Sequence, residues 1–385
     1  MSTPRAQLTE VYPMLPFEPV SGTGLYLRDD AGREVLDLYA GHAVAALGYG
    51  HPRLVHALAQ QAEQLYFQSN AVNLRIRDAA ADRLAAFAPE GLDRVFFVNS
   101  GAEANENALR IALRATGRKK IVAIERSFHG RSAAAAAVTW GAKDRWYGFP
   151  RTPMDVDFAP RNDVAALEAA IDADTAALII EPVQGLAGAF DFSHEFMTAA
   201  REACTRAGAL LILDEVQTGV GRLGEPFGAD LYDVRPDLLT TAKGLGGGFP
   251  CGAVVMTQDL AVDLKPGDLG TTFGGGPLAC AVIEAVIDTI ESDNVLDNVR
   301  AMSALVRETC THGPITAIQG AGLLLGLKTE VKASAVRNAL LERDILVGTS
   351  ADPHIMRLLP PLILNENHVA RLSSALKELN DESLQ

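Results

Sequence analysis

The middle of the chain alternates short apolar runs with stretches of helical character, and this alternation restricts the fold more than any other sequence feature. Most of the apolar runs lack an in-and-out polar pattern, so both faces of the predicted strands are expected to be covered. The runs span residues 94–98, 121–124, 176–180, 209–213, 238–241 and 253–256. Helical stretches lie between several of them, at residues 104–116, 165–171 and 195–206. This repetition predicts an α/β fold with a mostly parallel sheet and helices on both faces.

The two ends of the chain have a different pattern. Turn residues at 29–32 separate two apolar segments and predict a hairpin within residues 20–40. Beyond residue 280, long helices precede small strands, and one apolar stripe has helical spacing: Val295, Val299, Met302 and Val306. The mostly alanine run 132–137 predicts a short helix. We therefore predict a large domain at 46–278 and a smaller α+β domain built from residues 1–45 and 279–385.

Composition excludes several classes of function. Asp plus Glu number 48 against 34 for Lys plus Arg, which gives a formal net charge of −14. Such a chain lacks the basic face of a nucleic-acid binder and is disfavoured at an anionic membrane. No apolar run approaches the ~20 residues of a membrane span, and the N-terminus lacks the apolar segment of a secretory signal. The scattered cysteines and histidines predict no metal site and fit a reducing, cytoplasmic location.

Residues that carry chemistry directly follow the predicted strands. In an open α/β sheet, ligands bind beyond the carboxyl ends of the strands. Ser100, Gly101 and Ala102 open a helix, where free backbone amides can bind an anion. Phe128 follows the next strand and can stack on a planar ring, and Arg131 can hold a carboxylate. A helix cap, a core aromatic residue and a solvated arginine remain alternatives for these signals taken singly.

A carboxylate and an amine come after two further predicted strands. Asp214 ends a buried run and needs a cationic partner, because burial of an unpaired charge is costly. Lys243 precedes a glycine-rich loop and is a candidate covalent nucleophile or, alternatively, a surface lysine. Backbone donors for an anion, an aromatic side chain for stacking, a buried acid and a lysine are together what pyridoxal phosphate requires. A dinucleotide explains the set less well, since no GxGxxG follows the first strand.

Six ordered motifs give the chain its resemblance to a known family. They are NSGAEAN at 99–105, FHGR at 128–131, EPVQG at 181–185, DEVQTGVGR at 214–222, AKGLGGGFP at 242–250 and GTTFGGGPLA at 270–279. In these motifs the chain resembles the class III (ω-amino) aminotransferases that use pyridoxal 5'-phosphate, and most of all their acetylornithine branch. The resemblance implies fold type I, with a mostly parallel seven-stranded sheet flanked by helices.

The resemblance also implies roles for individual residues. Lys243 would bond covalently to the cofactor aldehyde, and Asp214 would pair with the pyridinium nitrogen. The other cofactor contacts would be Phe128 and Val216 on the two ring faces, Gln217 near the ring hydroxyl, and Ser100, Gly101 and Ala102 at the phosphate. In the family, the threonine matching Thr272 reaches the phosphate of the partner subunit, which implies a homodimer with composite active sites.

Two arginines match the family residues that bind substrate. Arg131 would hold the α-carboxylate of an ornithine-type donor and Arg357 that of glutamate. The implied reaction moves the ω-amino group of N-acetylornithine to 2-oxoglutarate, giving N-acetylglutamate semialdehyde and glutamate in arginine biosynthesis. Leu186 departs from the pattern, because many relatives carry there a glutamate that covers the arginine matching Arg357. We therefore expect weaker discrimination between α- and ω-amines.

Three alternatives remain from the sequence. The first is another ω-aminotransferase, with N-succinylornithine, ornithine, 4-aminobutyrate or a diamine as donor. The second is a mutase or racemase of the same fold, which would need no external keto acid. The third is a non-catalytic binding protein, which the presence of both Lys243 and Asp214 disfavours.

Overall fold

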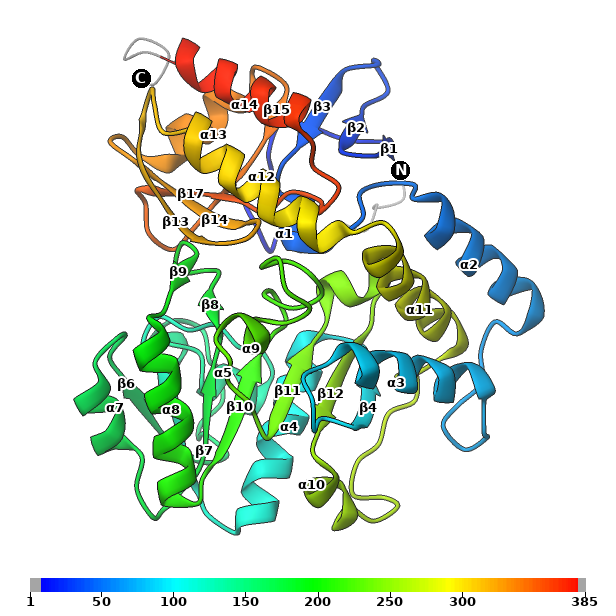
Figure 1. Ribbon diagram of the computed structural model, residues 1–385, viewed down its shortest axis with the longest axis vertical. Coiled ribbons are helices and arrows are strands. Elements are labelled where there is room, and N and C mark those ends of the chain that lie inside the picture. The colour runs from blue at the N-terminus through cyan, green and yellow to red at the C-terminus, as the bar shows by residue number, and fades with distance from the viewer. Residues whose placement is uncertain (1–7, 380–385) are drawn as a thin grey trace, which may run out of the picture.

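A seven-stranded sheet forms the centre of the computed structural model, which describes residues 8–379 (Figure 1). Its strand order is β4-β12-β11-β10-β7-β5-β6, and only β12 runs antiparallel to its neighbours. The strands are β4 Arg94–Val98, β5 Lys120–Ile124, β6 Asp155–Ala159, β7 Thr175–Ile180, β10 Leu210–Asp214, β11 Leu238–Thr241 and β12 Gly252–Met256. The predicted α/β class and the mostly parallel, seven-stranded sheet are confirmed.

One strand of this sheet does not correspond to any of the apolar runs. The six predicted strands are all present, with ends that differ by a residue at most. The seventh, β6, has the sequence DVDFA, in which Asp155 and Asp157 are exposed and interrupt the apolar residues. It lies at the edge of the sheet, and the face that carries Asp155 and Asp157 is exposed. The apolar-run criterion therefore misses it for a physical reason.

Both faces of the sheet are covered by helices, as the apolar runs predict. Alternate residues of one strand enter different apolar clusters: Leu178 packs on one face and Ile179 on the other. Helices α7 (Val164–Ala170) and α8 (His194–Ala207) cover the first face. Helices α4 (Gly101–Thr116) and α5 (Ala133–Ala137) cover the second. The helices predicted from 104, 132, 165 and 195 onward are thereby confirmed.

Further sheets are built from the two ends of the chain. Strands β1 (Ser21–Thr23), β2 (Tyr26–Arg28) and β3 (Glu34–Asp37) form the predicted hairpin region, and β15 (Ile345–Leu346) adds to β3. A second four-stranded sheet contains β13 Ile315–Ala321, β14 Leu324–Thr329, β16 Gly348–Thr349 and β17 Ile355–Leu358. The pairing of β3 with β15 brings residues 36 and 345 side by side. The domain boundaries remain a prediction, and residues 1–7 and 380–385 lie outside the described part.

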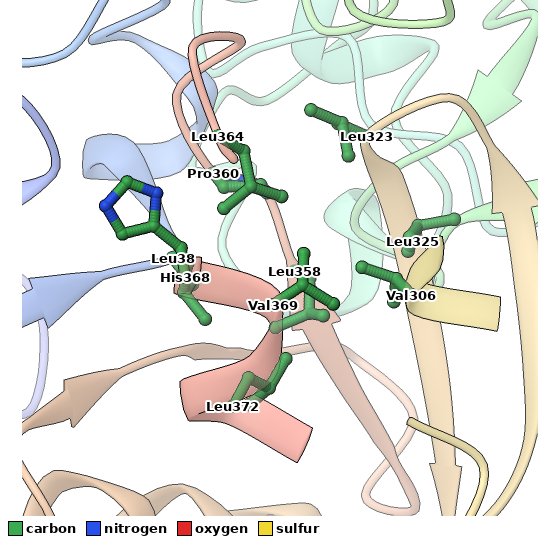
Figure 2. A pocket seen from close by; sticks show the side chains of 10 residues that line it. All are labelled: Leu38, Val306, Leu323, Leu325, Leu358, Pro360, Leu364, His368, Val369 and Leu372. Atoms are coloured by element: carbon green, nitrogen blue, oxygen red, sulfur yellow. The ribbon is translucent and has the colours of Figure 1, made fainter. Parts of the chain in front are cut away.

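The C-terminal helices pack on these strands, above the large sheet in Figure 1. They are α12 Val295–Thr309, α13 Ala333–Leu341 and α14 Glu366–Glu378, and the predicted stripe from Val295 to Val306 is buried in α12. Figure 2 shows mostly apolar side chains, with the imidazole of His368, around a cavity between α12, α14 and strands β14 and β17. The volume of this cavity is about 10 Å³. A space of this size barely admits one water molecule, and its lining offers little to bind it. It belongs to the core.

The remaining elements connect these layers. The longer ones are α2 Pro52–Gln64, α3 Arg75–Phe87 and α11 Pro277–Ser292, and α11 packs against both α2 and α3. The short ones are α1 Ala40–Ala43, α6 Ala142–Arg145, α9 Gly228–Leu231, α10 Gln258–Val262, the 3-10 turn η1 Lys243–Gly246, and the hairpin of β8 Val183–Gln184 and β9 Phe190–Asp191. Within residues 8–379, no helix combines the length and apolar character that a membrane span requires.

Candidate active site

Asp214 is held by three hydrogen bonds at the carboxyl end of β10. Its Oδ2 accepts from Nδ2 of Asn105 and from Nδ1 of His129, each at 2.7 Å, and its Oδ1 accepts from the amide of Val216 at 3.1 Å. The residue is buried. A carboxylate has about four lone-pair sites, so one site on Oδ1 stays open for a further donor. This arrangement suits a protonated ring nitrogen.

Asn105 and His129 are site residues that the sequence reasoning missed. Asn105 is buried, donates to the carbonyl of His129 at 2.8 Å and accepts from Oγ1 of Thr240 at 2.7 Å. The chain offered a signal for it, because Asn105 lies on the apolar face of α4 together with Ala108 and Leu109. A polar residue among buried apolar ones is expected to have a specific partner.

Lys243 begins the 3-10 turn η1, two residues after the end of β11. Its φ of 48° is left-handed, a conformation that lysine rarely adopts. Burial lowers the pKa of its amine to about 8, against the opposing effect of the carboxylates of Asp214 and Glu181. Among the described residues its amine has no hydrogen-bond partner within reach. The lowered pKa increases the neutral, nucleophilic fraction of the amine near physiological pH, as a covalent nucleophile requires.

The start of α4 presents backbone amides that suit an anion. Ser100 caps the helix, and its Oγ accepts from the amide of Glu103 at 3.2 Å. The amides of Gly101 and Ala102 have no partner in the described chain, as expected for a first helical turn. A Cβ atom on Gly101 would lie 2.6 Å from Cγ1 of Val216, so glycine is required for this close approach. The structure thus brings Val216 next to Ser100, Gly101 and Ala102, and their roles toward a cofactor remain a prediction.

Phe128 and Arg131 lie at a pocket of about 490 Å³ that also contains Trp146 and Leu186. The guanidinium carbon of Arg131 lies 4.4 Å from the centroid of the Trp146 ring and 6.0 Å from that of Phe128. Arg131 has no carboxylate within ion-pair distance among residues 8–379. Glu181, which sequence reasoning gave no role, fixes the backbone here: Oε1 accepts from the amide of Phe128 at 3.0 Å.

Arg357 lies in β17 with its side chain buried. Its guanidinium donates to Oη of Tyr39 and to the carbonyls of Thr349 and Gly185, at 2.8, 2.8 and 3.3 Å. None of these acceptors is charged. Burial lowers the pKa of Arg357, and Tyr39 and Glu181 oppose this effect. Leu186 follows Gly185 and lines the pocket of Arg131, so the segment 185–187 lies between the two arginines.

Two predicted residues have fewer contacts with this group. Gln217 packs over Gly185, where a Cβ atom would lie 1.7 Å from its Oε1, and its Nε2 donates to the carbonyl of His42 at 3.4 Å. Thr272 is exposed in the loop before α11, and no contact brings it to Lys243 within the described chain. The neighbouring Thr271 approaches the start of α4, with Oγ1 3.4 Å from Nδ2 of Asn99.

Comparison with known proteins agrees with this geometry. A sequence model described as aminotransferase class-III matches residues 9–379. The chain belongs to the class III aminotransferases. It is similar to an acetylornithine aminotransferase of Streptomyces coelicolor, with 44% identity over 96% of this chain and 92% of that protein. One from Methanopyrus kandleri is 40% identical over 96% and 95%. A crystal structure of ornithine aminotransferase from Toxoplasma gondii aligns with a TM-score of 0.91 at 30% identity, covering 98% and 92%.

This aminotransferase is a pyridoxal-phosphate enzyme, and its donor set fits that cofactor. The free amides at the start of α4 suit a phosphate, and the open lone-pair site on Asp214 suits a protonated pyridine nitrogen. Lys243 offers an amine to an aldehyde. The partly buried ring of Phe128 offers an aromatic face. The substrates of such an enzyme are an amino donor and a keto acid.

Proposed function

We propose that this aminotransferase moves the ω-amino group of N-acetylornithine to 2-oxoglutarate, giving N-acetylglutamate semialdehyde and glutamate. The observation that carries the proposal is the placement of two arginines without carboxylate partners on either side of the segment 185–187. One, Arg131, lines an aromatic pocket, and the other, Arg357, is buried. The names of the Streptomyces and Methanopyrus relatives support the same donor.

The proposed roles of the chain's residues follow from their contacts. Pyridoxal phosphate, when bound, supplies an aldehyde that takes up the amino group and a ring that stabilises negative charge at the substrate carbon. Lys243 would hold the cofactor and, once released, take a proton from the substrate carbon and return it as a general base and acid. Asp214 would keep the ring nitrogen protonated. Ser100, Gly101 and Ala102 would bind the phosphate, with Phe128 and Val216 against the ring and Gln217 at the ring hydroxyl.

Substrate recognition would use the two arginines in turn. Arg131 would bind the α-carboxylate of the donor, which places the terminal amine at the far end of the molecule. Arg357 would bind the α-carboxylate of 2-oxoglutarate or glutamate. A guanidinium forms two parallel hydrogen bonds with a carboxylate, and such charge-assisted pairs are strong where water is excluded.

A panel of donors tests the proposed function. The holoenzyme is supplied with 2-oxoglutarate and N-acetylornithine, N-succinylornithine, ornithine, 4-aminobutyrate or a diamine, and glutamate formation is followed. We expect the highest kcat/KM with N-acetylornithine, and a drop of about tenfold to a hundredfold in the Arg131→Lys variant, which loses bidentate binding. Higher kcat/KM with another donor would replace the proposal by that donor's reaction. Product formation without a keto acid would indicate a mutase or racemase.

Half-reactions of the holoenzyme, measured without a keto acid, test discrimination between α- and ω-amines. Leu186 is 38% exposed and has no charge to cover Arg357. Glutamate, with its α-amine, should therefore convert the enzyme in a single-turnover reaction with a second-order rate constant close to that of N-acetylornithine. A large preference for the ω-amine would show that Leu186 does not weaken discrimination.

We further propose a cytoplasmic homodimer in which Thr272 contributes to the partner's phosphate site. Its neighbour Phe273 is 65% exposed, and Phe67 is 40% exposed. The centroids of their two rings lie 5.2 Å apart. Exposed apolar surface of this kind is typical of an interface. The four buried, unpaired cysteines of the described chain agree with a reducing compartment. A monomer in sedimentation velocity of the active enzyme would contradict the dimer.

A further inference from the structure

Arg357 is a buried cation that is oriented entirely by neutral groups. Its three hydrogen-bond acceptors are two backbone carbonyls and the phenol oxygen of Tyr39, and no carboxylate of residues 8–379 forms an ion pair with it. The carbonyls belong to the strand β16 and to the loop after β8, so they are fixed by the fold. Tyr39 is the one side chain among the acceptors. A substitution can therefore remove its contribution without changing the backbone.

The phenol of Tyr39 connects Arg357 to His42. Oη of Tyr39 lies 2.8 Å from the guanidinium nitrogen and 2.8 Å from Nδ1 of His42. A guanidinium only donates, so the phenol oxygen accepts from Arg357, and its own hydrogen is free to be donated to Nδ1 of His42. His42 then needs a free lone pair on Nδ1, as in the neutral imidazole. Burial, together with the charges of Arg357 and Lys243, lowers the pKa of His42 to about 4, which agrees with that state.

The backbone that carries this pair is held in an unusual conformation. Residues 40–43 all have positive φ, from 48° to 68°, which L-residues rarely adopt in succession. The carboxylate of Asp37 accepts from the amides of Tyr39 and Ala40 at 2.7 and 2.9 Å and fixes the turn. The turn returns the ring of His42 to within 4.8 Å of the Tyr39 ring. Strained backbone of this kind persists where the surrounding contacts determine it.

Strand β16, which pairs with β17 beside Arg357, leaves room for the ring of Tyr39. Gly348 pairs with Arg357 across the sheet. A Cβ atom on Gly348 would lie 1.9 Å from Cε2 of Tyr39, so any larger residue there would displace the ring. The ring of Tyr39 thus lies against Gly348, hydrogen-bonded to Arg357 on one side and to His42 on the other.

We propose that Tyr39 and His42 are positioning residues that hold Arg357 ready for a substrate carboxylate through a chain of hydrogen bonds from guanidinium to phenol to imidazole. The inference rests on the proposed function, in which Arg357 receives 2-oxoglutarate. Neutral acceptors orient the guanidinium and leave it without a direct ion pair among residues 8–379. The incoming carboxylate therefore has no internal ion pair to break. Binding of the donor, whose carboxylate is proposed to bind Arg131, does not depend on these hydrogen bonds.

The Tyr39→Phe variant tests the proposal, because it keeps the ring and removes the oxygen. The two half-reactions are measured separately in single turnover on the holoenzyme, one with N-acetylornithine on its aldehyde form and one with 2-oxoglutarate on its amino form. We expect the apparent dissociation constant for 2-oxoglutarate to rise about tenfold, which is ~1.4 kcal/mol. The half-reaction with N-acetylornithine should change less than twofold. Equal losses in both half-reactions would indicate a general structural role and overturn the proposal.

Substitutions of His42 separate the hydrogen bond from the shape of the turn. His42→Asn keeps an acceptor and tolerates positive φ, whereas His42→Leu has no acceptor. We expect His42→Asn to remain close to the parent enzyme and His42→Leu to show part of the Tyr39→Phe effect. Equal behaviour of the two variants toward 2-oxoglutarate would show that the hydrogen bond of His42 has no role in positioning Arg357.

A double substitution shows whether Tyr39 acts through Arg357. In an Arg357→Lys background, Tyr39→Phe should have little further effect on 2-oxoglutarate, because the group it positions is gone. Full additivity would contradict the proposal. Binding of 2-oxoglutarate to the holoenzyme by calorimetry separates this question from the proposed function. If N-acetylornithine is no substrate, the proposed donor fails, yet weaker binding to Tyr39→Phe still supports the positioning role, and unchanged binding overturns it.

Discussion

Replacing Lys243 by alanine is expected to lower kcat by about 10⁴-fold, the upper end of the range for a positioned acid–base group. The effect should be this large because one amine is proposed both to hold the cofactor and to move the proton. Lys243→Arg is the matched control, since it keeps the positive charge but its guanidinium cannot give up a proton. Both variants should be inactive in the assay of glutamate formation. Activity in Lys243→Arg would mean that charge alone suffices.

The amine of Lys243 can also be followed without turnover. The neutral form reacts with an amine reagent, so its labelling rate rises with pH up to the pKa. Because burial lowers this pKa to about 8, the rate measured on cofactor-free protein should have its midpoint near 8. An ordinary lysine titrates near ~10.4. Mass spectrometry of the peptide that contains Lys243 gives the rate, and a midpoint near that of the other lysines would contradict the assigned environment.

The sequence predicts the large sheet well because its strands are buried on both faces. A strand such as β7 is buried at every position and almost entirely apolar, and the residue that follows such a run lies at the ligand-binding edge. Asp214 and Lys243 could be found in this way, as residues out of place at the end of an apolar run. The edge strand β6 could not, because its exposed side tolerates Asp155 and Asp157.

The parts of the site that depend on distant contacts could not be predicted. Asn105 and Asp214 are 109 residues apart, and only the packing of α4 on the sheet brings them within 2.7 Å. The left-handed turn at 40–43 is another case, since one glycine among those residues gives no reason to expect four positive φ angles. Its conformation depends on the contacts of Asp37 and Tyr39. The resemblance to a family implies roles for residues, but it does not predict such contacts either.

Substitution of Asp214 by asparagine is expected to lower kcat by about 10²–10³-fold, the usual loss for one preorganised charged group. The neutral amide cannot keep a ring nitrogen protonated. It also fits poorly, because the carboxylate accepts from Asn105 and His129 on one oxygen and from the Val216 amide on the other. In either orientation, the NH₂ group of asparagine faces a donor.

Three measurements distinguish the loss of charge from the loss of fit. Cofactor affinity, kcat at saturating cofactor and the melting temperature are compared for Asp214→Asn and Asp214→Glu. The glutamate variant keeps the charge but moves it by one methylene, so it should be less stable than the parent yet retain more activity than the asparagine variant. Full kcat in Asp214→Asn at saturating cofactor would show that the carboxylate only holds the cofactor. A low kcat with a melting temperature close to that of the parent would assign it the electrostatic role.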